Sequence, residues 1–134
     1  MHSQIYEYEY DVNVVADDID EMGHVNNAVY LKWVQAAVLH QWRRLAPQEV
    51  AAAHLWVALK HEISYRRPAF LNDHVDVQVV LEKLSGARAF YQTLILHGDV
   101  VLAEVKSCWC CLDAITRKPV RLARDIAARF LSQP

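Results

Sequence analysis

The polar stretch from residue 18 to residue 27 carries side chains that can do acid–base chemistry. It reads Asp-Ile-Asp-Glu-Met-Gly-His-Val-Asn-Asn and lies between a segment with the period of a strand and one typical of a buried helix. The start of a helix presents unpaired N–H groups and a partial positive charge. A carboxylate beside such a start can act on a reactant while the N–H groups stabilise an oxygen that becomes negative. The residue types and their spacing are therefore compatible with a reactive site in this stretch.

The segments on either side of this stretch differ in hydrophobic period. Residues 5–14 alternate, which predicts a strand with one buried face. The residues expected on that face are Tyr6, Tyr8, Tyr10, Val12 and Val14. Residues 28–45 carry apolar side chains almost all round, so they predict a helix that is buried on most sides and ends before Pro47. Asn26 or Asn27 is suited to cap its start.

The second half of the chain predicts four more strands. After a short helical or irregular connector at residues 47–54, the strands are expected over residues 55–65, 75–82, 87–97 and 100–112. In the first of them, the alternation places these residues inward: Val57, Leu59, His61, Ile63 and Tyr65. A final helix is expected over residues 122–131. A strand, a long helix and four strands with short connections predict an α+β fold with the helix against one sheet face.

Length and composition limit the classes of protein to which the chain can belong. The 134 residues fit one domain, residues 1–134, with a real core. Hydrophobic residues make up 54%, so a core or a subunit interface must cover them. The net charge of -2, without a basic run, argues against nucleic acid as the main partner. The N-terminus has no signal pattern and no apolar run could span a bilayer, so we expect a cytoplasmic protein with no membrane partner.

Three cysteines lie in one predicted strand, at Cys108, Cys110 and Cys111. An odd, clustered set is a poor disulfide framework. Neighbours on a strand point to opposite faces, so Cys110 and Cys111 cannot easily share one tetrahedral metal site. We therefore expect small core or interface residues here and no metal site.

Several strings of residues together resemble those of a known family. The most specific one reads Asp18-x-Asp20-x-x-Gly23-His24-Val25-Asn26-Asn27-x-x-Tyr30. Supporting strings are Tyr65-x-x-Pro68-Ala69, Asn72-Asp73, Leu112-Asp113 and Thr116-Arg117-Lys118-Pro119. They resemble the hotdog-fold acyl-CoA thioesterases of the 4-hydroxybenzoyl-CoA thioesterase type, and the likeness covers nearly the whole chain.

The resemblance implies a fold, an assembly and a reaction. The fold would be a five-stranded antiparallel sheet wrapped around one long central helix. The assembly would be a homodimer with joined sheets or a homotetramer, a dimer of dimers, with active sites at the subunit interface. The reaction would be hydrolysis of an acyl-CoA thioester to a carboxylic acid and coenzyme A. No metal or redox cofactor is implied, and coenzyme A enters only as part of the small-molecule substrate.

Asp20 matches the catalytic carboxylate of this family, which lies three residues before the turn glycine, here Gly23. In that role Asp20 attacks the thioester carbonyl or activates water for the attack. The spacing alone favours a turn or capping aspartate, and the resemblance shifts the prediction to catalysis. Asp18 is expected to bond N–H groups of the loop. The oxyanion-binding N–H of the family comes from the helix start, which here falls near Asn27.

Other residues are assigned to the site with less specific support. His24 is either a second polar group near the thioester or a loop histidine that bonds the backbone. Gly23, Asn26 and Tyr30 are expected to border the substrate. The phosphates of coenzyme A need cations, and Arg88 is assigned to them because the family often carries basic residues after this turn. The other candidate cations are Arg66, Arg67, Lys83, Arg117 and Lys118.

Two alternative functions stay open on the same fold. A small hotdog protein can bind or sense an acyl thioester without hydrolysing it. A hotdog hydratase is the second alternative, although that class normally needs an Asp/His pair with a different spacing. Release of free thiol from acyl-CoA substrates separates hydrolysis from both.

Overall fold

A computed structural model describes residues 7–131, and the sequence folds there into one five-stranded sheet with helices on and beside it. The strand order is β1-β3-β4-β5-β2, and each neighbouring pair is antiparallel. The strands are β1 (Glu7–Asn13), β2 (His54–Tyr65), β3 (His74–Ser85), β4 (Arg88–His97) and β5 (Val100–Asp113). The helices are the 3-10 turn η1 (Ala16–Asp18), α1 (Asn27–Leu45), α2 (Gln48–Ala53) and α3 (Arg124–Leu131).

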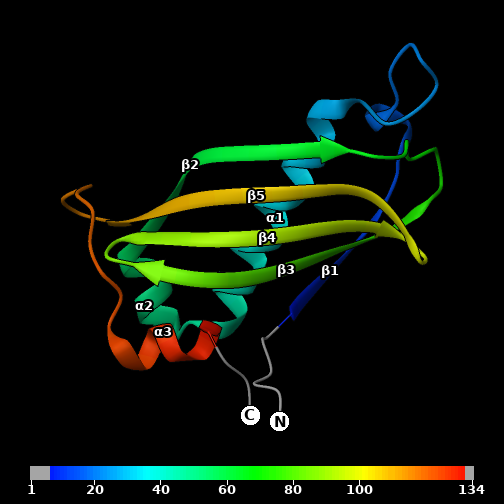
Figure 1. Cartoon of the computed structure of the whole chain (residues 1–134). Coiled ribbons are helices and arrows are strands. Elements are labelled where there is room, and N and C mark those ends of the chain that lie inside the picture. The colour runs from blue at the N-terminus through cyan, green and yellow to red at the C-terminus, as the bar shows by residue number, and fades with distance from the viewer. Residues whose placement is uncertain (1–6, 132–134) are drawn as a thin grey trace, which may run out of the picture.

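The long helix α1 lies across one face of this sheet, and the core lies between them (Figure 1). The inward residues of β3, at most 3% exposed, are Val75, Val77, Val79 and Leu81, as the alternation predicted. The side chains of α1 buried against the sheet include Val29, Tyr30, Trp33, Val34, Ala37, Val38 and Trp42. The predicted α+β arrangement is therefore confirmed, with element ends within two residues of those expected for the long helix and most strands. The first two residues of the predicted N-terminal strand, 5 and 6, lie outside the described residues.

The inward face of β2 differs from the one predicted. Val57 and Leu59 are 43% and 50% exposed, whereas Trp56 packs against the core. The pairing of β2 with β5 shifts register between Ala58 and Lys60, so one extra residue is inserted there. Such a bulge moves the following side chains to the other face of the strand. An unbroken alternation in the sequence gives no sign of this insertion.

The cysteines of β5 are core residues, as expected. Cys110 and Cys111 are buried, and Cys108 is half-buried. Burial raises the pKa of the Cys111 thiol to about 12, so the thiol stays protonated and unreactive at neutral pH. None of the helices that the described residues form is long and apolar enough to cross a membrane.

Beyond the bulge, His61 points inward as predicted. Its Nδ1 lies 2.7 Å from the Ser107 hydroxyl, and its ring meets that of Trp109 edge-on at 6.0 Å. Its Nε2 is buried and has no hydrogen-bond partner among the described residues. Burial disfavours the charged imidazolium, and this lowers the pKa of His61.

His61 is therefore expected to weaken the fold in acid. The unfolded chain binds a proton at the ordinary histidine pKa of about 6.5, whereas the folded chain resists it, so the free energy of unfolding falls as the pH drops below that value. Urea unfolding at pH 7.5 and pH 5.5 measures this loss. The loss should be smaller in His61→Gln and unchanged in His97→Gln, because His97 is exposed. An equal loss in His61→Gln and wild type would contradict this role.

Candidate active site

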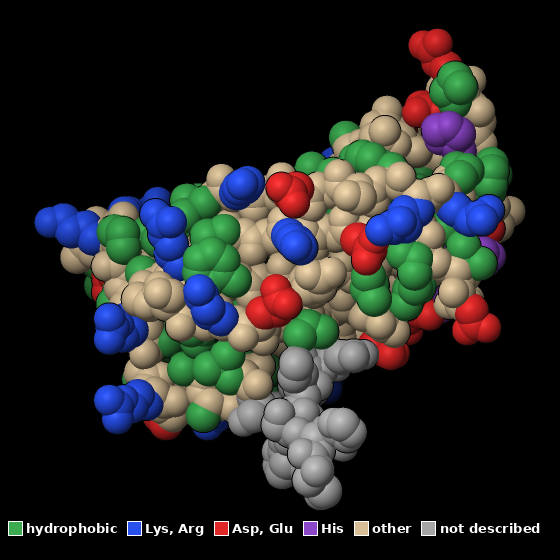
Figure 2. Space-filling view, viewed as in Figure 1, with side chains coloured by type: hydrophobic (Ala, Val, Ile, Leu, Met, Phe, Trp, Pro, Cys, Tyr) green, Lys and Arg blue, Asp and Glu red, His purple; other side chains and the backbone are tan. Residues whose placement is uncertain are grey.

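The loop between η1 and α1 is a tight hairpin. Ile19 and Val25 form an antiparallel bridge, and the Asp20 N–H donates to the His24 carbonyl at 3.0 Å. The Gly23 N–H closes the turn by donating to the Asp20 carbonyl at 3.0 Å. Gly23 has a φ of +82°, a conformation that favours glycine. Figure 2 shows this loop projecting at the upper right, with acidic side chains at its tip.

Backbone and side-chain bonds hold the hairpin to the body of the molecule. The fully buried Val25 donates its N–H to the Ala69 carbonyl at 2.8 Å. The Asn26 N–H donates to the Asp18 carbonyl at 2.8 Å. The Asp18 carboxylate accepts the Val15 N–H at 3.0 Å, which is the structural role expected for it. The position of the helix start relative to the hairpin is therefore fixed by several bonds.

At the start of helix α1, the Asn26 side chain accepts one backbone N–H group, and another backbone N–H group stays free. Asn26 is its N-cap, and the Asn26 Oδ1 accepts the Ala28 N–H at 2.9 Å. The Val29 N–H donates to the Asn26 carbonyl at 2.9 Å. The N–H of Asn27, the first helical residue, finds no acceptor among the described residues. An oxygen that gains negative charge would be stabilised at this N–H, since the helix dipole adds to the hydrogen bond.

A cavity of about 220 Å³ lies at this helix start. Its lining comes from the hairpin, from the first turn of α1 and from the chain after β2: His24, Asn27, Tyr30, Tyr65, Arg66, Arg67 and Pro68. The Tyr65 hydroxyl donates to the Asn27 carbonyl at 2.8 Å. The buried Tyr30 hydroxyl accepts the Ala69 N–H at 3.1 Å, and burial raises the pKa of Tyr30, so it stays a neutral phenol. The two tyrosine rings meet edge-on at 5.4 Å.

Two arginines and a histidine give this cavity its basic groups. Arg66 forms an ion pair with Glu104. None of the ion pairs that the described residues form includes Arg67. The His24 Nδ1 lies 3.2 Å from the Val25 carbonyl, which is the backbone contact expected of a loop histidine, and its ring also lines the cavity. Arg67 is therefore the cation that is free to meet an anionic ligand here.

Asp20 is not among the residues that line this cavity. Its Oδ1 accepts the Met22 N–H at 2.9 Å, so the carboxylate supports the turn. The bond between the Asp20 N–H and the His24 carbonyl places it across the hairpin from a lining residue. Its Oδ2 has no partner among the described residues. A catalytic role for Asp20 stays a prediction.

Some of the other predicted site residues line the cavity and some do not. His24, Asn27 and Tyr30 meet at the cavity, whereas Gly23 and Asn26 shape the hairpin and the helix cap without lining it. Tyr65 also lines the cavity, although the sequence predicted no role for it in the site. The Tyr-x-x-Pro string at residues 65–68 was the available signal, because it was already part of the family resemblance.

Arg88 does not reach this cavity within one chain. Arg88 is the first residue of β4. Further along β4, Ile95 pairs with Ala103 of β5, and Ala103 pairs in turn with Tyr65 of β2, which lines the cavity. The seven steps along the strand from Arg88 to Ile95 span about 23 Å, at roughly 3.3 Å per residue. Arg88 therefore lies far from the helix start within one chain, and its role in substrate binding stays a prediction.

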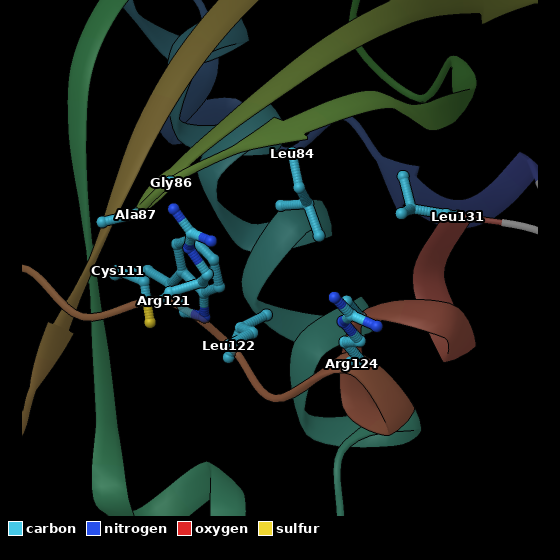
Figure 3. Close-up of a pocket in the computed structure, with 10 residues that line it drawn as sticks. Leu84, Gly86, Ala87, Cys111, Arg121, Leu122, Arg124 and Leu131 are labelled. Atoms are coloured by element: carbon cyan, nitrogen blue, oxygen red, sulfur yellow. The ribbon is translucent and has the colours of Figure 1, made fainter.

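A second cavity, of about 270 Å³, lies at the Arg88 end of the sheet (Figure 3). Its lining comes from β2, the β3–β4 turn, β5, α3 and the segment that leads into α3. Apolar side chains such as Leu84 and Leu122 share its wall with Arg121 and Arg124. Positive charge is therefore gathered at the end of the sheet that lies opposite the helix start.

Comparison with known proteins connects this geometry with a family. The profile of the thioesterase-like superfamily matches residues 14–130. The long-chain acyl-CoA thioesterase FadM of Escherichia coli strain K12 is 30% identical over 120 residues, which cover 84% of this chain and 88% of FadM. The acyl-CoA thioester hydrolase YbgC of Escherichia coli strain CFT073 is 26% identical over 127 residues, which cover 92% of this chain and 95% of YbgC.

Solved structures share the fold. A thioesterase from Thermus thermophilus, complexed with coenzyme A and Zn, has a TM-score of 0.79 at 27% identity, and the match covers 91% of this chain and 90% of that chain. A probable thioesterase from Bartonella henselae has a TM-score of 0.78 at 26% identity, covering 88% of this chain and all of that chain, 100%. The hotdog arrangement expected from the sequence is thus confirmed.

Proposed function

The chain belongs to the thioesterase-like superfamily, and from this premise we propose that it is an acyl-CoA thioesterase, which hydrolyses a thioester to a carboxylic acid and coenzyme A. The relatives named as acyl-CoA thioester hydrolases and the relative solved with coenzyme A support this proposal. The observation that carries it is the Asn27 N–H, a free donor at a helix start that borders a cavity.

In this proposal the thioester carbonyl oxygen accepts a hydrogen bond from the Asn27 N–H. Two routes are open to Asp20. In the first, Asp20 takes a proton from a water molecule while the water oxygen forms a bond to the carbonyl carbon. In the second, an Asp20 carboxylate oxygen forms the bond to the carbonyl carbon directly. The carbonyl electron pair moves onto the oxygen, where the N–H and the helix dipole stabilise the negative charge. When the carbon–oxygen double bond re-forms, the carbon–sulfur bond breaks and the thiolate leaves. In the second route, water then hydrolyses the anhydride between Asp20 and the acyl group.

The hydrolysis assay is a panel of acyl-CoA thioesters with free thiol as the readout. Thiol release above the background rate supports hydrolysis. Binding without thiol release would favour the acyl-binding alternative, and conversion of an enoyl-CoA without thiol release would favour a hydratase. We propose that no metal or redox cofactor takes part, so prior treatment with a chelator should leave the rate unchanged. A rate that falls and is restored by added metal would contradict that part.

Arg67→Ala is expected to raise KM for acyl-CoA by roughly 10- to 150-fold with little change in kcat. A guanidinium that bonds a phosphate contributes about 1.5–3 kcal/mol of binding, and coenzyme A phosphates lie away from the reacting carbon. Initial rates over a range of substrate concentrations, at low and high salt, measure this effect. Arg67→Lys keeps the charge and serves as the control. A fall in kcat at unchanged KM would contradict a phosphate-binding role.

We further propose that the protein works as a homodimer or homotetramer with sites at the subunit interface. The exposed Val57 and Leu59 on the edge strand β2 support this, because an apolar sheet edge is normally covered. A monomer in sedimentation at micromolar concentration would contradict this proposal. A cytoplasmic location and a single domain stay predictions.

A further inference from the structure

Three potential metal ligands meet on the sheet face that points away from α1. Asp11 of β1 lies directly opposite Asp76 of β3 in the antiparallel register. His74 precedes Asp76 by two residues, so their side chains share a face. Val75, between them, is fully buried on the other side against the core. The trio is therefore held by paired backbone, on the opposite face of the sheet from the proposed thioester site.

The distances within this trio suit one small cation. The ligand atoms of Asp11, His74 and Asp76 all lie within 4.8 Å of one another. The His74 Nε2 is 3.2 Å from an Asp76 oxygen and 3.7 Å from an Asp11 oxygen. Ligands at about 2.0–2.2 Å from Zn²⁺ lie about 3.3–3.6 Å from one another in a tetrahedron. Small side-chain adjustments would bring all three atoms onto one ion.

A fourth residue orients the imidazole. The His74 Nδ1 lies 3.2 Å from the Asn13 Oδ1, which is only an acceptor. The proton of the neutral ring therefore belongs on Nδ1, and the lone pair of Nε2 faces the two carboxylates. Metal-binding histidines are commonly held by such a bond from the other ring nitrogen.

The two carboxylates are crowded without a cation. Like charges directly opposite each other on neighbouring strands are destabilising. A divalent ion would replace the repulsion between Asp11 and Asp76 with attraction to both.

We propose that Asp11, His74 and Asp76 bind one divalent transition-metal ion, with Zn²⁺ as the expected ion. An imidazole with two carboxylates suits Zn²⁺ better than Mg²⁺ or Ca²⁺, which prefer oxygen ligands alone. All three side chains reach solvent, so water completes the coordination. The ion ties β1 to β3 where both strands enter the loops, next to the bond from the Val14 N–H to the Asp73 carbonyl. Its role is to stabilise this sheet edge, independently of thioester hydrolysis.

Calorimetric titration of the full, untagged, chelator-treated chain with Zn²⁺ tests this site. The expected result is one ion per chain and a rise in Tm when Zn²⁺ is added. Substitution with Co²⁺ gives a second readout, an absorption spectrum typical of nitrogen and oxygen ligands without a thiolate charge-transfer band. Absence of binding would overturn the proposal, as would a thiolate band that disappears in Cys108→Ser.

Substitution of the ligands assigns the site. His74→Ala, Asp11→Asn and Asp76→Asn should each weaken Zn²⁺ binding by at least about 10-fold. Asp11→Asn should also abolish the Zn²⁺-induced rise in Tm while leaving Tm in chelator at or above the wild-type value, because a like-charge pair is removed. Glu62→Gln neutralises an exposed carboxylate on β2, at the opposite edge of the sheet, and should keep wild-type affinity. Unchanged affinity in the ligand variants, or an equal loss in Glu62→Gln, would overturn the assignment.

Discussion

Asn27→Pro is expected to lower kcat for acyl-CoA hydrolysis by about 10²–10³-fold, the usual cost of removing one oxyanion-binding donor. Proline has no N–H, so this change deletes the donor at the start of α1. The fold should tolerate it, because proline is favoured at the first position of a helix. Asn26, the preceding residue, has φ -59° and ψ 135°, which is the extended conformation that proline imposes on its neighbour.

The matched control for this prediction is Asn27→Ala, which keeps the backbone N–H and removes only the side chain. Its kcat should stay within a few-fold of wild type, and both variants should have a Tm close to that of wild type. Initial-rate kinetics and thermal unfolding on the same preparations measure both quantities. A proline variant with wild-type kcat, or an alanine variant that loses as much activity as the proline variant, would contradict the role given to this N–H.

Asp20→Asn is expected to lower kcat by about 10²–10⁴-fold, the contribution typical of a positioned general base. The asparagine Oδ1 can still accept the Met22 N–H, so the turn that Asp20 supports should persist. The substitution therefore separates the charge of this side chain from its structural role. A variant that keeps both its Tm and its wild-type kcat would leave Asp20 as a turn residue only.

Glu21→Gln is the control for the Asp20 prediction. Glu21 is the next residue, is exposed, and has the same charge. Neutralising Glu21 tests whether the hydrolysis rate depends on the Asp20 carboxylate in particular or on any negative charge in the hairpin. Thiol release by Glu21→Gln should stay within about two-fold of wild type. An equal loss in the two variants would point to the field of the whole acidic loop rather than to one carboxylate.

Local patterns in the sequence were sufficient to predict most of the fold. The alternation of valines in β3 predicted its buried face, because period two reflects the pleat directly. Asn26 was one of two predicted caps, because its side chain meets the first free N–H groups of the helix. The face of β2 was predicted wrongly at Val57 and Leu59, since a bulge depends on pairing with β5 and leaves no periodic signal.

The site was less predictable than the fold, because distant segments build it. His24, Asn27 and Tyr30 lie within seven residues of one another, and motif spacing brought them together correctly. Tyr65 and Arg67 reach the same cavity only through the sheet, so spacing along the chain could not associate them with the helix start. The opposite happened with Arg88. The family resemblance assigned it to the substrate, but in a single chain it lies at the far end of β4 from the cavity.

The most direct test of the proposed chemistry is a crystal structure with an acyl-CoA analogue in which the thioester sulfur is replaced by carbon. The account predicts the carbonyl oxygen about 2.7–3.1 Å from the Asn27 nitrogen. It also predicts an Asp20 oxygen about 3.0–3.5 Å from the carbonyl carbon, or hydrogen-bonded to a water at that distance. A carbonyl that points away from the start of α1, or an Asp20 carboxylate that stays remote from the carbonyl carbon and from any such water, would contradict it.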